Sequence, residues 1–533
     1  TLSSSSAASD VYKRQGLIFA KFKHNLNLIK MNIQVRNLTL EDYSDLTEST
    51  KEAYHNQLGT WTVDEIKELL AIFPQGQLCV EVDGKVVASA LSIIVNSKKT
   101  NIESNYDTIT SNGKFLKHDP EGDVMYGIEV FVHPNYRQLR LGRRLYDERK
   151  ALCEEMNLKS IVAGGRIPNY HKYSQELSPR QYIEKVKSKE IYDSTLAFQI
   201  SNDFNVKKIL KNYLKDDKES LEYATLLEWN NIYYEPELKS NSPTKRTIRL
   251  GLVQWQMRLF NGLQDFYDQI EFFVSAVSDY GSDFIMFPEF FNSPLMSPYN
   301  HLKEIEAMHQ LATMTDDIVK KIQEFAITYN VNIISGSMPH LKEGKLYNTS
   351  FLCHRSGKLD SYSKIHITPN EFKYYALNGG DEIKVFDTDC GKVGLLICYD
   401  VEFPELSRIL ADQGMEILFV PFMTDTQNGY TRVRSCAQAR AIENECYVAI
   451  AGSVGNLPRV NNMDIQYSQS AVFTPSDFSF PNNGVKAEAT PNTEMVLISD
   501  VDLYLLKELH EYGTVKTMKD RRKDLYEVKL IKS

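Results

Sequence analysis

Residues 391–405 read GKVGLLICYDVEFPE, an apolar run that ends at a cysteine and is followed at once by a helical pattern. The run VGLLI at 393–397 is short, apolar and partly β-branched, which predicts a central strand buried on both faces. Pro404 stands where the first turn of a helix tolerates a residue without an N–H. Cys398 is therefore expected between the end of a buried strand and the start of a helix.

Cys398 admits two interpretations at this point. The positive end of the following helix and the nearby backbone N–H groups favour a thiolate, which would make Cys398 a nucleophile. Cysteine is also among the residue types most often fully buried, so simple packing explains it equally well. Other residues must decide between the two.

Two further polar residues follow apolar runs in the same half of the chain. Glu289 ends the stretch FIMFPE, and Lys364 lies in YSKIHITPNE. Taken singly, Glu289 is equally typical of a turn or helix cap, and Lys364 of an exposed charge at a strand end. A thiol that attacks an amide or nitrile carbon, however, needs a base and a fixed positive charge. Strands that end at one rim would bring both groups to Cys398.

The motifs FPE, SKIHITP and GLLICYDVEFPE, in this order, resemble those of the nitrilase, or carbon-nitrogen hydrolase, superfamily. The stretch ARAIEN at 439–444 resembles a helix motif of that family, and the resemblance covers about residues 247–510. It implies an αββα sandwich and a catalytic triad, in which Glu289 is the general base, Lys364 stabilises the oxyanion and Cys398 forms a thioester.

The resemblance also implies supporting residues around the triad. The backbone N–H of Tyr399 would be the second oxyanion donor. A further glutamate is expected soon after the lysine, with Glu371 as the candidate and Glu382 as the alternative. His366 is interpreted as a structural hydrogen-bonding residue. No cofactor is expected for this domain.

Three arginines precede or belong to the ARAIEN motif, namely Arg432, Arg434 and Arg440. They have two interpretations, as ligands of a substrate carboxylate or as partners of acids on their own helix. Pairing along the helix is favoured.

Composition limits the class of protein. The chain has 533 residues, a formal net charge of −9 and a pI near 5.8, without a sustained basic face, which argues against nucleic acid or a membrane surface as partner. Seven cysteines without a CxxC pair argue against a disulfide framework and a zinc site, so no metal is expected. A reducing, cytoplasmic location fits this cysteine usage best.

The length predicts more than one domain. Residues 1–30 are interpreted as an extraneous or disordered leader, with a transit peptide as the rival, because patterned sequence begins at Met31. A first domain is predicted at 31–234, a polar linker with two prolines at 235–246, a second domain at 247–520 and a tail at 521–533. The fold class is α/β, or α+β taken over the two domains.

The first domain contains a strand that runs into a basic helix. A hairpin with Asp83-Gly84 at its turn is followed by the strand VMYGIEVFV at 124–132 and then by YRQLRLGRRLYDERKALCEEM. A Gly-containing, basic helix start after a strand is typical of a pyrophosphate site. Basic first turns are also common on solvated helix faces, so the spacing alone leaves both interpretations open.

This order resembles the acetyl-CoA motif of the GNAT acetyltransferases, whose Arg-Gly-x-Gly-x-Gly/Ala places are taken here by Arg137, Gln138, Arg140 and Gly142. Two positions that are small in the family carry Gln138 and Arg140 instead. The resemblance implies acetyl-CoA as cofactor, bound by Val130, Val132, Arg137, Gln138, Leu139, Arg140, Leu141, Gly142 and Arg143.

For acetyl transfer, Glu129 is the candidate base and Tyr213 the candidate acid, against strand pairing and packing as the alternative roles.

The function predicted from these patterns is hydrolysis of a small non-peptide amide, or of a carbamoyl compound, through a Cys398 thioester. Two rival hypotheses remain: a protein that is primarily an N-acetyltransferase, and a scaffold in which acetyl-CoA regulates the hydrolase. A homo-oligomer is expected by resemblance only.

Overall fold

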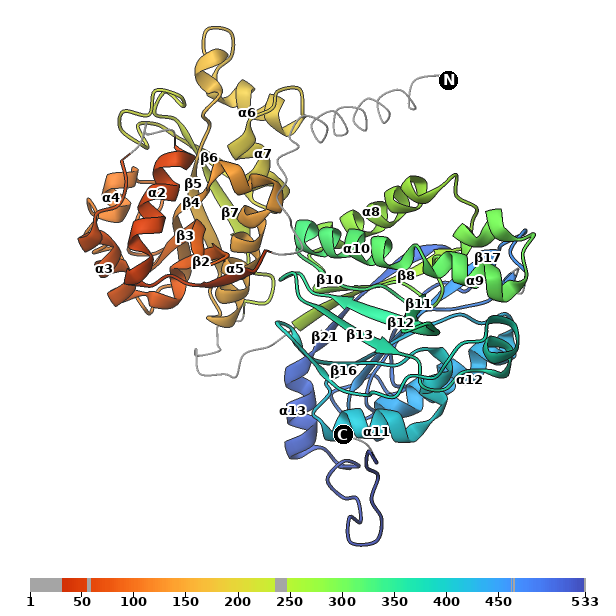
Figure 1. Cartoon of the computed structure of the whole chain (residues 1–533). Coiled ribbons are helices and arrows are strands. Elements are labelled where there is room, and N and C mark those ends of the chain that lie inside the picture. Colours follow the sequence, from red (N-terminus) through yellow and green to blue (C-terminus); the bar gives the residue numbers. More distant parts are fainter. Residues whose placement is uncertain (1–30, 55–58, 235–246, 462, 464, 532–533) are drawn as a thin grey trace.

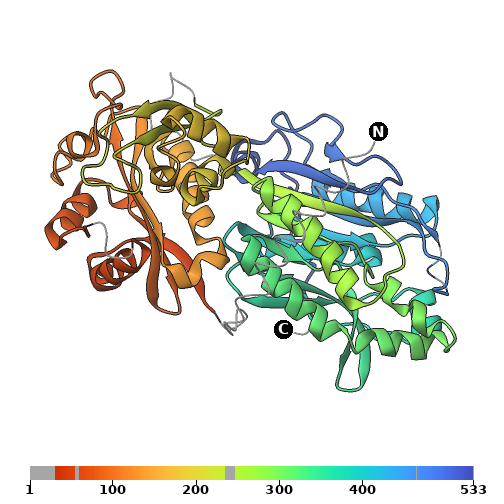
Figure 2. The same cartoon turned by 90° about the horizontal axis from the view of Figure 1, so that it is seen from above.

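The computed structural model describes residues 31–54, 59–234, 247–461, 463 and 465–531. The predicted leader (1–30) and linker (235–246) lie outside the described residues. The described chain forms two domains, each with its own sheet system, at residues 31–234 and 247–531 (Figures 1 and 2).

The N-terminal domain, as far as it is described, contains a seven-stranded sheet in the order β1-β2-β3-β4-β5-β7-β6. Asp83 and Gly84 join β2 to β3 with φ of 51° and 82°, the two positive values that a type I′ turn requires, so the predicted hairpin is confirmed. The predicted strand at 124–132 is also confirmed. The strands are β1 (Ile33–Asn37), β2 (Leu78–Val82), β3 (Lys85–Val95), β4 (Val124–Val132), β5 (Ser160–Arg166), β6 (Asn205–Leu210) and β7 (Ala224–Asn230).

The parallel strands β4 and β5 separate halfway along their length. Val124 to Gly127 pair with Ser160 to Ala163. Beyond these residues β4 pairs only with β3, and β5 only with β7. Backbone N–H and C=O groups on the facing edges are therefore open to a ligand at this point.

Helices cover both faces of this sheet. α6 begins where the sequence places a strong start signal: Ser178 forms a capping box with Gln181, and Pro179 is the first helical residue. The helices are α2 (Tyr43–Ala53), α3 (Val63–Ile72), α4 (Tyr106–Thr110), α5 (Leu141–Glu155), α6 (Pro179–Lys187) and α7 (Ser194–Ser201), with short 3-10 turns at η2 (Leu40–Asp42), η3 (Pro74–Gly76), η4 (Pro134–Leu139) and η5 (Tyr170–Lys172).

The C-terminal domain is a sandwich of two sheets, one with the order β11-β12-β10-β9-β8 and the other β17-β16-β15-β14. They are continuous where β17 pairs with β8 at Ser453 and Trp255. The strands are β8 (Thr247–Gln256), β9 (Phe284–Met286), β10 (Asn332–Ile334), β11 (Met338–Lys342), β12 (Lys345–Cys353), β13 (Leu359–Ser363), β14 (Phe386–Thr388), β15 (Gly391–Leu395), β16 (Ile417–Phe422), β17 (Tyr447–Asn456), β18 (Ile465–Gln466), β19 (Ala471–Phe473), β20 (Val485–Glu488) and β21 (Met495–Asp502).

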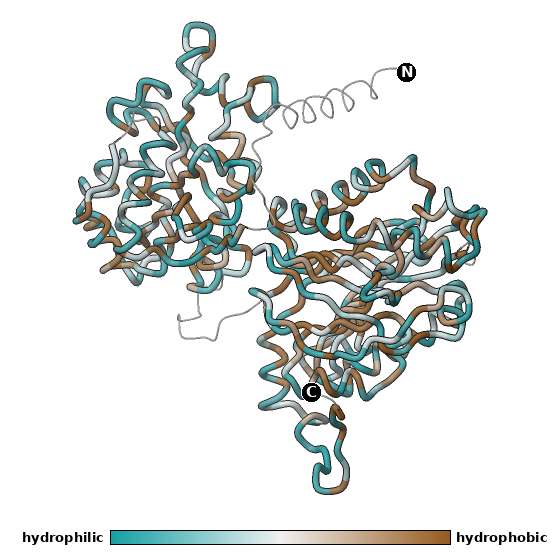
Figure 3. The backbone as a smooth tube through the Cα atoms, in the orientation of Figure 1, coloured by the Kyte–Doolittle hydropathy of each residue, from teal (hydrophilic) through white to brown (hydrophobic). Residues whose placement is uncertain are grey.

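Helices lie outside both sheets, α8 and α10 on one side and α11 and α12 on the other (Figure 1). Apolar side chains meet between the sheets, where the rings of Phe284 and Phe419 are 5.1 Å apart, and the interior strands are correspondingly apolar in Figure 3. The predicted αββα order is therefore observed. The helices are α8 (Leu263–Asp279), α9 (Glu304–Ala312), α10 (Thr315–Tyr329), α11 (Pro404–Asp412), α12 (Gln427–Glu443) and α13 (Leu503–Tyr512), with a 3-10 helix η6 (Ser293–Tyr299) and a π-helical turn η7 (Glu371–Tyr375).

The stretch at 391–405 folds nearly as its pattern predicts. The strand β15 ends at Leu395, two residues earlier than expected. A 3-10 helix, η8 (Cys398–Glu402), then precedes α11, which begins at Pro404. Cys398 therefore opens a tight turn, and its φ of 46° is left-handed, which a side chain with a Cβ rarely adopts. The predicted tail is attached at its first residue, since Arg521 forms an ion pair with Asp412.

Candidate active sites

Glu289, Lys364 and Cys398 lie together at one rim of the sandwich. Each follows a strand: Glu289 comes after β9, Lys364 directly after β13 and Cys398 after β15. The ammonium nitrogen of Lys364 is 2.8 Å from Oε1 of Glu289. All three side chains are buried, with exposed fractions of 2% for Glu289, 1% for Lys364 and 7% for Cys398. The rim arrangement expected from the sequence is thus present.

Of the two candidate auxiliary glutamates, Glu371 lies in this cluster. Its two carboxylate oxygens are 2.8 and 2.9 Å from the Lys364 ammonium. Glu371 opens the turn η7, and the backbone N–H of Thr368 donates to it. Glu382 is exposed and pairs with Lys384 instead, so it is outside the site.

Two residues that the sequence did not indicate complete the cluster. The side-chain amide of Asn348 on β12 donates to Glu289 at 2.9 Å and to Glu371 at 3.2 Å. The backbone of Met423, just after β16, donates its N–H to Glu289 at 3.0 Å and accepts from the Cys398 sulfur at 3.7 Å. Met423 therefore fixes the base and the thiol relative to each other.

Asp400, two residues after Cys398, connects the lysine loop to the cysteine turn. Its fully buried carboxylate accepts from the Tyr362 hydroxyl at 2.8 Å and from the His366 N–H at 2.8 Å. The His366 ring contacts the same carboxylate and stacks on Phe403 at 3.6 Å between centroids. These contacts agree with a structural role for His366, and they hold the segments that carry Lys364 and Cys398 in register.

Charges in this site are strongly coupled. Burial lowers the pKa of Lys364, but the charges of Glu289 and Glu371 outweigh that effect and hold the pKa well above its usual value. Burial raises the pKa of Glu289, although the Lys364 charge opposes the rise. Lys364 is therefore a fixed cation, as an oxyanion site requires.

The protonation state of Cys398 differs from the sequence-based expectation. Burial, together with the neighbouring Glu289 charge, raises the pKa of the Cys398 thiol well above its usual value. The interpretation that the helix start makes Cys398 a thiolate is thus wrong for this site. The turn that follows it is a single 3-10 segment, and desolvation outweighs its dipole. A thiol beside a carboxylate can act as a nucleophile only if that carboxylate takes its proton.

A cavity of about 810 Å³ leads to Cys398. Arg432 lies on its wall and pairs with Glu402 of η8, at 3.4 Å, and not with an acid on its own helix. The favoured pairing along the helix holds for Arg440, which binds Glu443, but is wrong for Arg434, whose partner Glu488 lies on β20. The polar part of the lining includes Glu289, Lys364, Thr368, Asn370, Glu371, Tyr374, Tyr375, Tyr399, Glu402, Thr424, Asp425, Thr426, Arg432 and Gln466.

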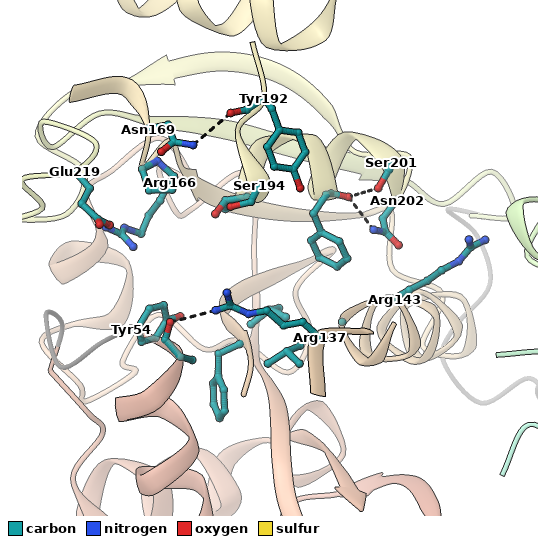
Figure 4. A pocket seen from close by; sticks show the side chains of 18 of the residues that line it. Tyr54, Arg137, Arg143, Arg166, Asn169, Tyr192, Ser194, Ser201, Asn202 and Glu219 are labelled. Atoms are coloured by element: carbon teal, nitrogen blue, oxygen red, sulfur yellow. Dashed lines mark hydrogen bonds and ion pairs between the residues drawn. The ribbon is translucent and has the colours of Figure 1, made fainter. Parts of the chain in front are cut away.

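A second cavity, of about 890 Å³, lies in the N-terminal domain where β4 and β5 separate (Figure 4). Val130, Val132, Arg137 and Gly142 line it, as predicted for acetyl-CoA. A Cβ on Gly142 would come within 2.8 Å of the Phe198 ring, so only glycine fits here without displacing that ring. The open strand edge, the helix start and Arg137 suit a pantetheine diphosphate, so these residues fit the cofactor that the resemblance implies.

Arg140 and Arg143 also line this cavity, but their charged groups contact the C-terminal domain. The Arg140 guanidinium carbon lies 4.2 Å from the centre of the Tyr329 ring. Arg143 donates to Asp279 at 3.0 Å and to the Ser278 carbonyl, and in Figure 4 its side chain extends away from Arg137. Their predicted phosphate contacts remain predictions, and Gln138, Leu139 and Leu141 are absent from the described lining.

The candidate acid and base of acetyl transfer have different surroundings. Glu129, on β4, accepts from the Trp61 indole at 2.7 Å, and burial raises its pKa to about 7. Tyr54, a cavity residue, also hydrogen-bonds Glu129. Tyr213 is buried and contacts the Tyr126 hydroxyl at 3.1 Å, which favours packing over an acid role. Neither Glu129 nor Tyr213 is among the described lining residues, but Glu129 contacts the lining residue Tyr54.

Two negative findings concern the described residues alone. They contain no helix that is both long and apolar enough to cross a membrane. They also contain no group of three or more His, Cys, Asp or Glu side chains arranged to hold a metal ion.

A buried cluster of Cys398, Glu289 and Lys364 at the rim of an αββα sandwich is the arrangement that the resemblance to the carbon-nitrogen hydrolases implies. The model of the carbon-nitrogen hydrolase family matches residues 249–511, and that of the GNAT acetyltransferase family matches residues 37–174. The chain is 43% identical over 507 residues to a probable hydrolase, YhcX, of Bacillus subtilis, covering 95% of this chain and 99% of that protein. The chain therefore belongs to the carbon-nitrogen hydrolase family, with a GNAT domain at its N-terminal side.

Two other relatives each match one half. The N-terminal half is 32% identical to the uncharacterized N-acetyltransferase YkwB of Bacillus subtilis, over 38% of this chain and 91% of that protein. The C-terminal half is 29% identical to the omega-amidase NIT2 of Mus musculus, over 53% of this chain and 98% of that protein. We refer below to the acetyltransferase domain and the hydrolase domain.

Proposed function

We propose that the hydrolase domain cleaves the C–N bond of a small, non-peptide amide through a thioester on Cys398. The observation that carries this proposal is the cluster in which one lysine bridges two buried glutamates beside a buried thiol. Neither a packing cysteine nor a surface ion pair needs such an arrangement, because burying three ionisable groups together is costly.

In the first half of the reaction, Glu289 takes the Cys398 proton as the sulfur bonds to the amide carbon and the C=O electron pair moves to oxygen. Lys364 and the Tyr399 backbone N–H stabilise that oxyanion, with about 3 to 4 kcal/mol for a well-placed donor. The C–N bond then breaks, and Glu289 gives its proton to the leaving nitrogen. Ammonia or an amine departs and a thioester remains.

In the second half, Glu289 takes a proton from a water molecule while the oxygen of that water bonds to the thioester carbon. The C–S bond breaks, and the proton returns to sulfur as the carboxylic acid leaves. Glu371 and Asn348 act through position: they hold Lys364 and Glu289 by the hydrogen bonds described above.

The substrate is proposed to be a small molecule with a terminal amide or carbamoyl group. Cys398 is 7% exposed and lies in a cavity of about 810 Å³, which suits a small molecule and excludes a folded polypeptide. The likeness to proteins named omega-amidases supports amides over nitriles.

The test is ammonia release from a panel of amides, carbamoyl compounds and nitriles, with intact mass to detect the acyl adduct. Cys398→Ala should abolish turnover and adduct, whereas Cys436→Ala, at a partly buried cysteine that is not among the lining residues of the cavity, should keep both. Turnover by the Cys398→Ala protein would refute the mechanism.

A second activity is favoured by one specific observation: Glu129, with a pKa of about 7, lies beside the separated strands. Acetyl-CoA would supply the activated acetyl group. Glu129 would take the proton of an acceptor amine, with Trp61 and Tyr54 fixing its carboxylate. Thiol release from acetyl-CoA with a panel of amines tests this proposal, and Glu129→Gln should lose at least about 10²-fold in rate.

Location and assembly complete the proposal. All seven cysteines are free, which supports a reducing compartment such as the cytoplasm. A homo-oligomer remains a prediction, and light scattering of the purified chain would test it.

A further inference from the structure

The residues around the start of α5 include arginines that a phosphate site would use, yet Arg140, Arg143 and Arg144 contact the hydrolase domain. Arg144 donates to the carbonyls of Ile327 at 2.6 Å and Arg355 at 3.1 Å. Arg140 stacks on Tyr329, and Arg143 binds the end of α8. In contrast, Arg137 keeps its guanidinium in the acetyltransferase domain, where it donates to the Ala53 carbonyl at 3.3 Å.

The two domains pack closely against each other at their boundary, and this contact is called the joint. Ile327 of the hydrolase domain belongs to the same buried apolar cluster as Leu141 and Leu145 of α5. Arg144 is only 4% exposed, so a phosphate could reach this arginine only if the joint opened. Arg144 is therefore a structural anchor.

Arg143 differs, because it lies at the edge of the joint and on the wall of the cavity of about 890 Å³, where the GNAT resemblance places acetyl-CoA. Its Nη1 binds the Asp279 carboxylate at 3.0 Å, its Nη2 binds the Ser278 carbonyl, and its Nε is 4.0 Å from Asp147. Every nitrogen of the guanidinium faces an oxygen of the protein. Asp279 also lines the cavity, and its side chain is 65% exposed.

We propose that Asp279 of the hydrolase domain belongs to the acyl-CoA site and competes with the cofactor phosphates for Arg143. The start of α5 attracts an anion through its N–H groups and dipole, and Arg143 stands three residues after the left-handed Arg140 that caps the helix. To donate to a phosphate, Arg143 must release Asp279 or Ser278. Asp279 therefore keeps Arg143 from the anion until that exchange occurs.

The expected change in acetyl-CoA affinity depends on how strongly Asp279 binds Arg143. Since the pair is exposed on the Asp279 side, its contribution is small, and removing the aspartate charge should tighten acetyl-CoA binding about twofold to fivefold. The gain should shrink at high salt, because exposed charges are screened.

The experiment is calorimetry of acetyl-CoA with the full chain and with Asp279→Asn, Arg143→Gln and the double variant. The matched control is Asp268→Asn, an exposed aspartate on the same helix. Tighter binding by Asp279→Asn, weaker binding by Arg143→Gln and no effect of Asp279→Asn in the Arg143→Gln background would support the proposal.

Hydrogen exchange gives a readout independent of affinity. Acetyl-CoA should speed exchange of the amides at the end of α8, around Asp279, because Arg143 leaves them. Unchanged or weaker binding by Asp279→Asn, an effect that persists without Arg143, or no binding by the unaltered chain would overturn the proposal. It rests on the GNAT domain and not on amide hydrolysis, so the two proposals fail separately.

Discussion

Replacing Lys364 by methionine tests the charge arrangement of the hydrolase site most directly. Oxygens of Glu289 and Glu371 each lie 2.8 Å from the Lys364 nitrogen, so without the ammonium the two carboxylates face each other within about 6 Å. At an effective dielectric constant of about 20, two such charges repel by about 3 kcal/mol. Removing one partner of a buried ion pair costs about 3 to 5 kcal/mol in general, which agrees with this figure.

The loss should depend on pH, because the folded variant can avoid the repulsion by binding a proton. One carboxyl then has a folded-state pKa above its unfolded value. Such a group contributes stability that is present below the unfolded pKa and lost as pH rises through the folded pKa. The deficit of Lys364→Met should therefore be small near pH 5 and larger near pH 8.5.

Hydrogen exchange of the amides of β15 and β16 measures this deficit for the hydrolase domain alone. The matched control is Lys384→Met, which removes the exposed partner of Glu382 and should change the opening free energy by at most about 1 kcal/mol at either pH. Amide turnover should be lost in Lys364→Met and kept in the control. A Lys364→Met domain with the same opening free energy as the unaltered one at high pH, or a deficit that does not change with pH, would refute the reasoning.

Three further predictions concern other parts of the molecule. Asp400→Asn should lower kcat about 10- to 100-fold, because an amide cannot accept all the hydrogen bonds that Asp400 receives. The exposed control Asp387→Asn should leave kcat unchanged, and equal kcat values for the two variants would contradict the role of Asp400. Acetyl transfer should rise with pH through about 7, since Glu129 is a base only when deprotonated, and Glu129→Gln should remove that rise; a profile that survives the substitution would exclude Glu129. Amide turnover should change less than about twofold on adding acetyl-CoA, and a larger change would favour the regulatory scaffold.

The sequence predicted that three residues meet because each of them lies just after an apolar strand. Glu289, Lys364 and Cys398 each follow an apolar strand with its own motif, and the sandwich brings those ends to one rim. The predicted end of the strand β15 was two residues too late, because the apolar pattern continues into the turn in which Cys398 has a left-handed backbone.

Other parts of the site carry no local signal. Asn348 lies in the middle of β12, where a polar residue is equally typical of the solvent face of a strand. Asp400 acts through contacts with residues more than 30 positions earlier, and such pairings follow from the fold and not from spacing. The Cys398 pKa was misjudged because burial depends on every neighbour, whereas the helix-start argument uses only the chain around the cysteine.

The roles of the arginines around the start of α5 could not be predicted from the sequence either, because their partners lie in the other domain. In the isolated pattern they indicate a phosphate site, and nothing in the sequence states that the ends of α8 and α10 lie against them. Arg140 occupies a left-handed position where the family pattern has a small residue. The Tyr329 ring is the contact that gives this arginine a role.

The short path from Asp279 to Glu289 explains why cofactor binding and amide turnover are expected to be independent. Only a turn and the strand β9 separate the two residues, yet β9 is paired on both sides, with β8 and with β10. The turn is fixed by Asp283, whose N–H donates to the Arg249 carbonyl at 2.8 Å and whose carboxylate accepts from the Arg249 N–H. Glu289 itself has three further hydrogen-bond partners. A shift at the exposed end of α8 is therefore absorbed before it reaches the base.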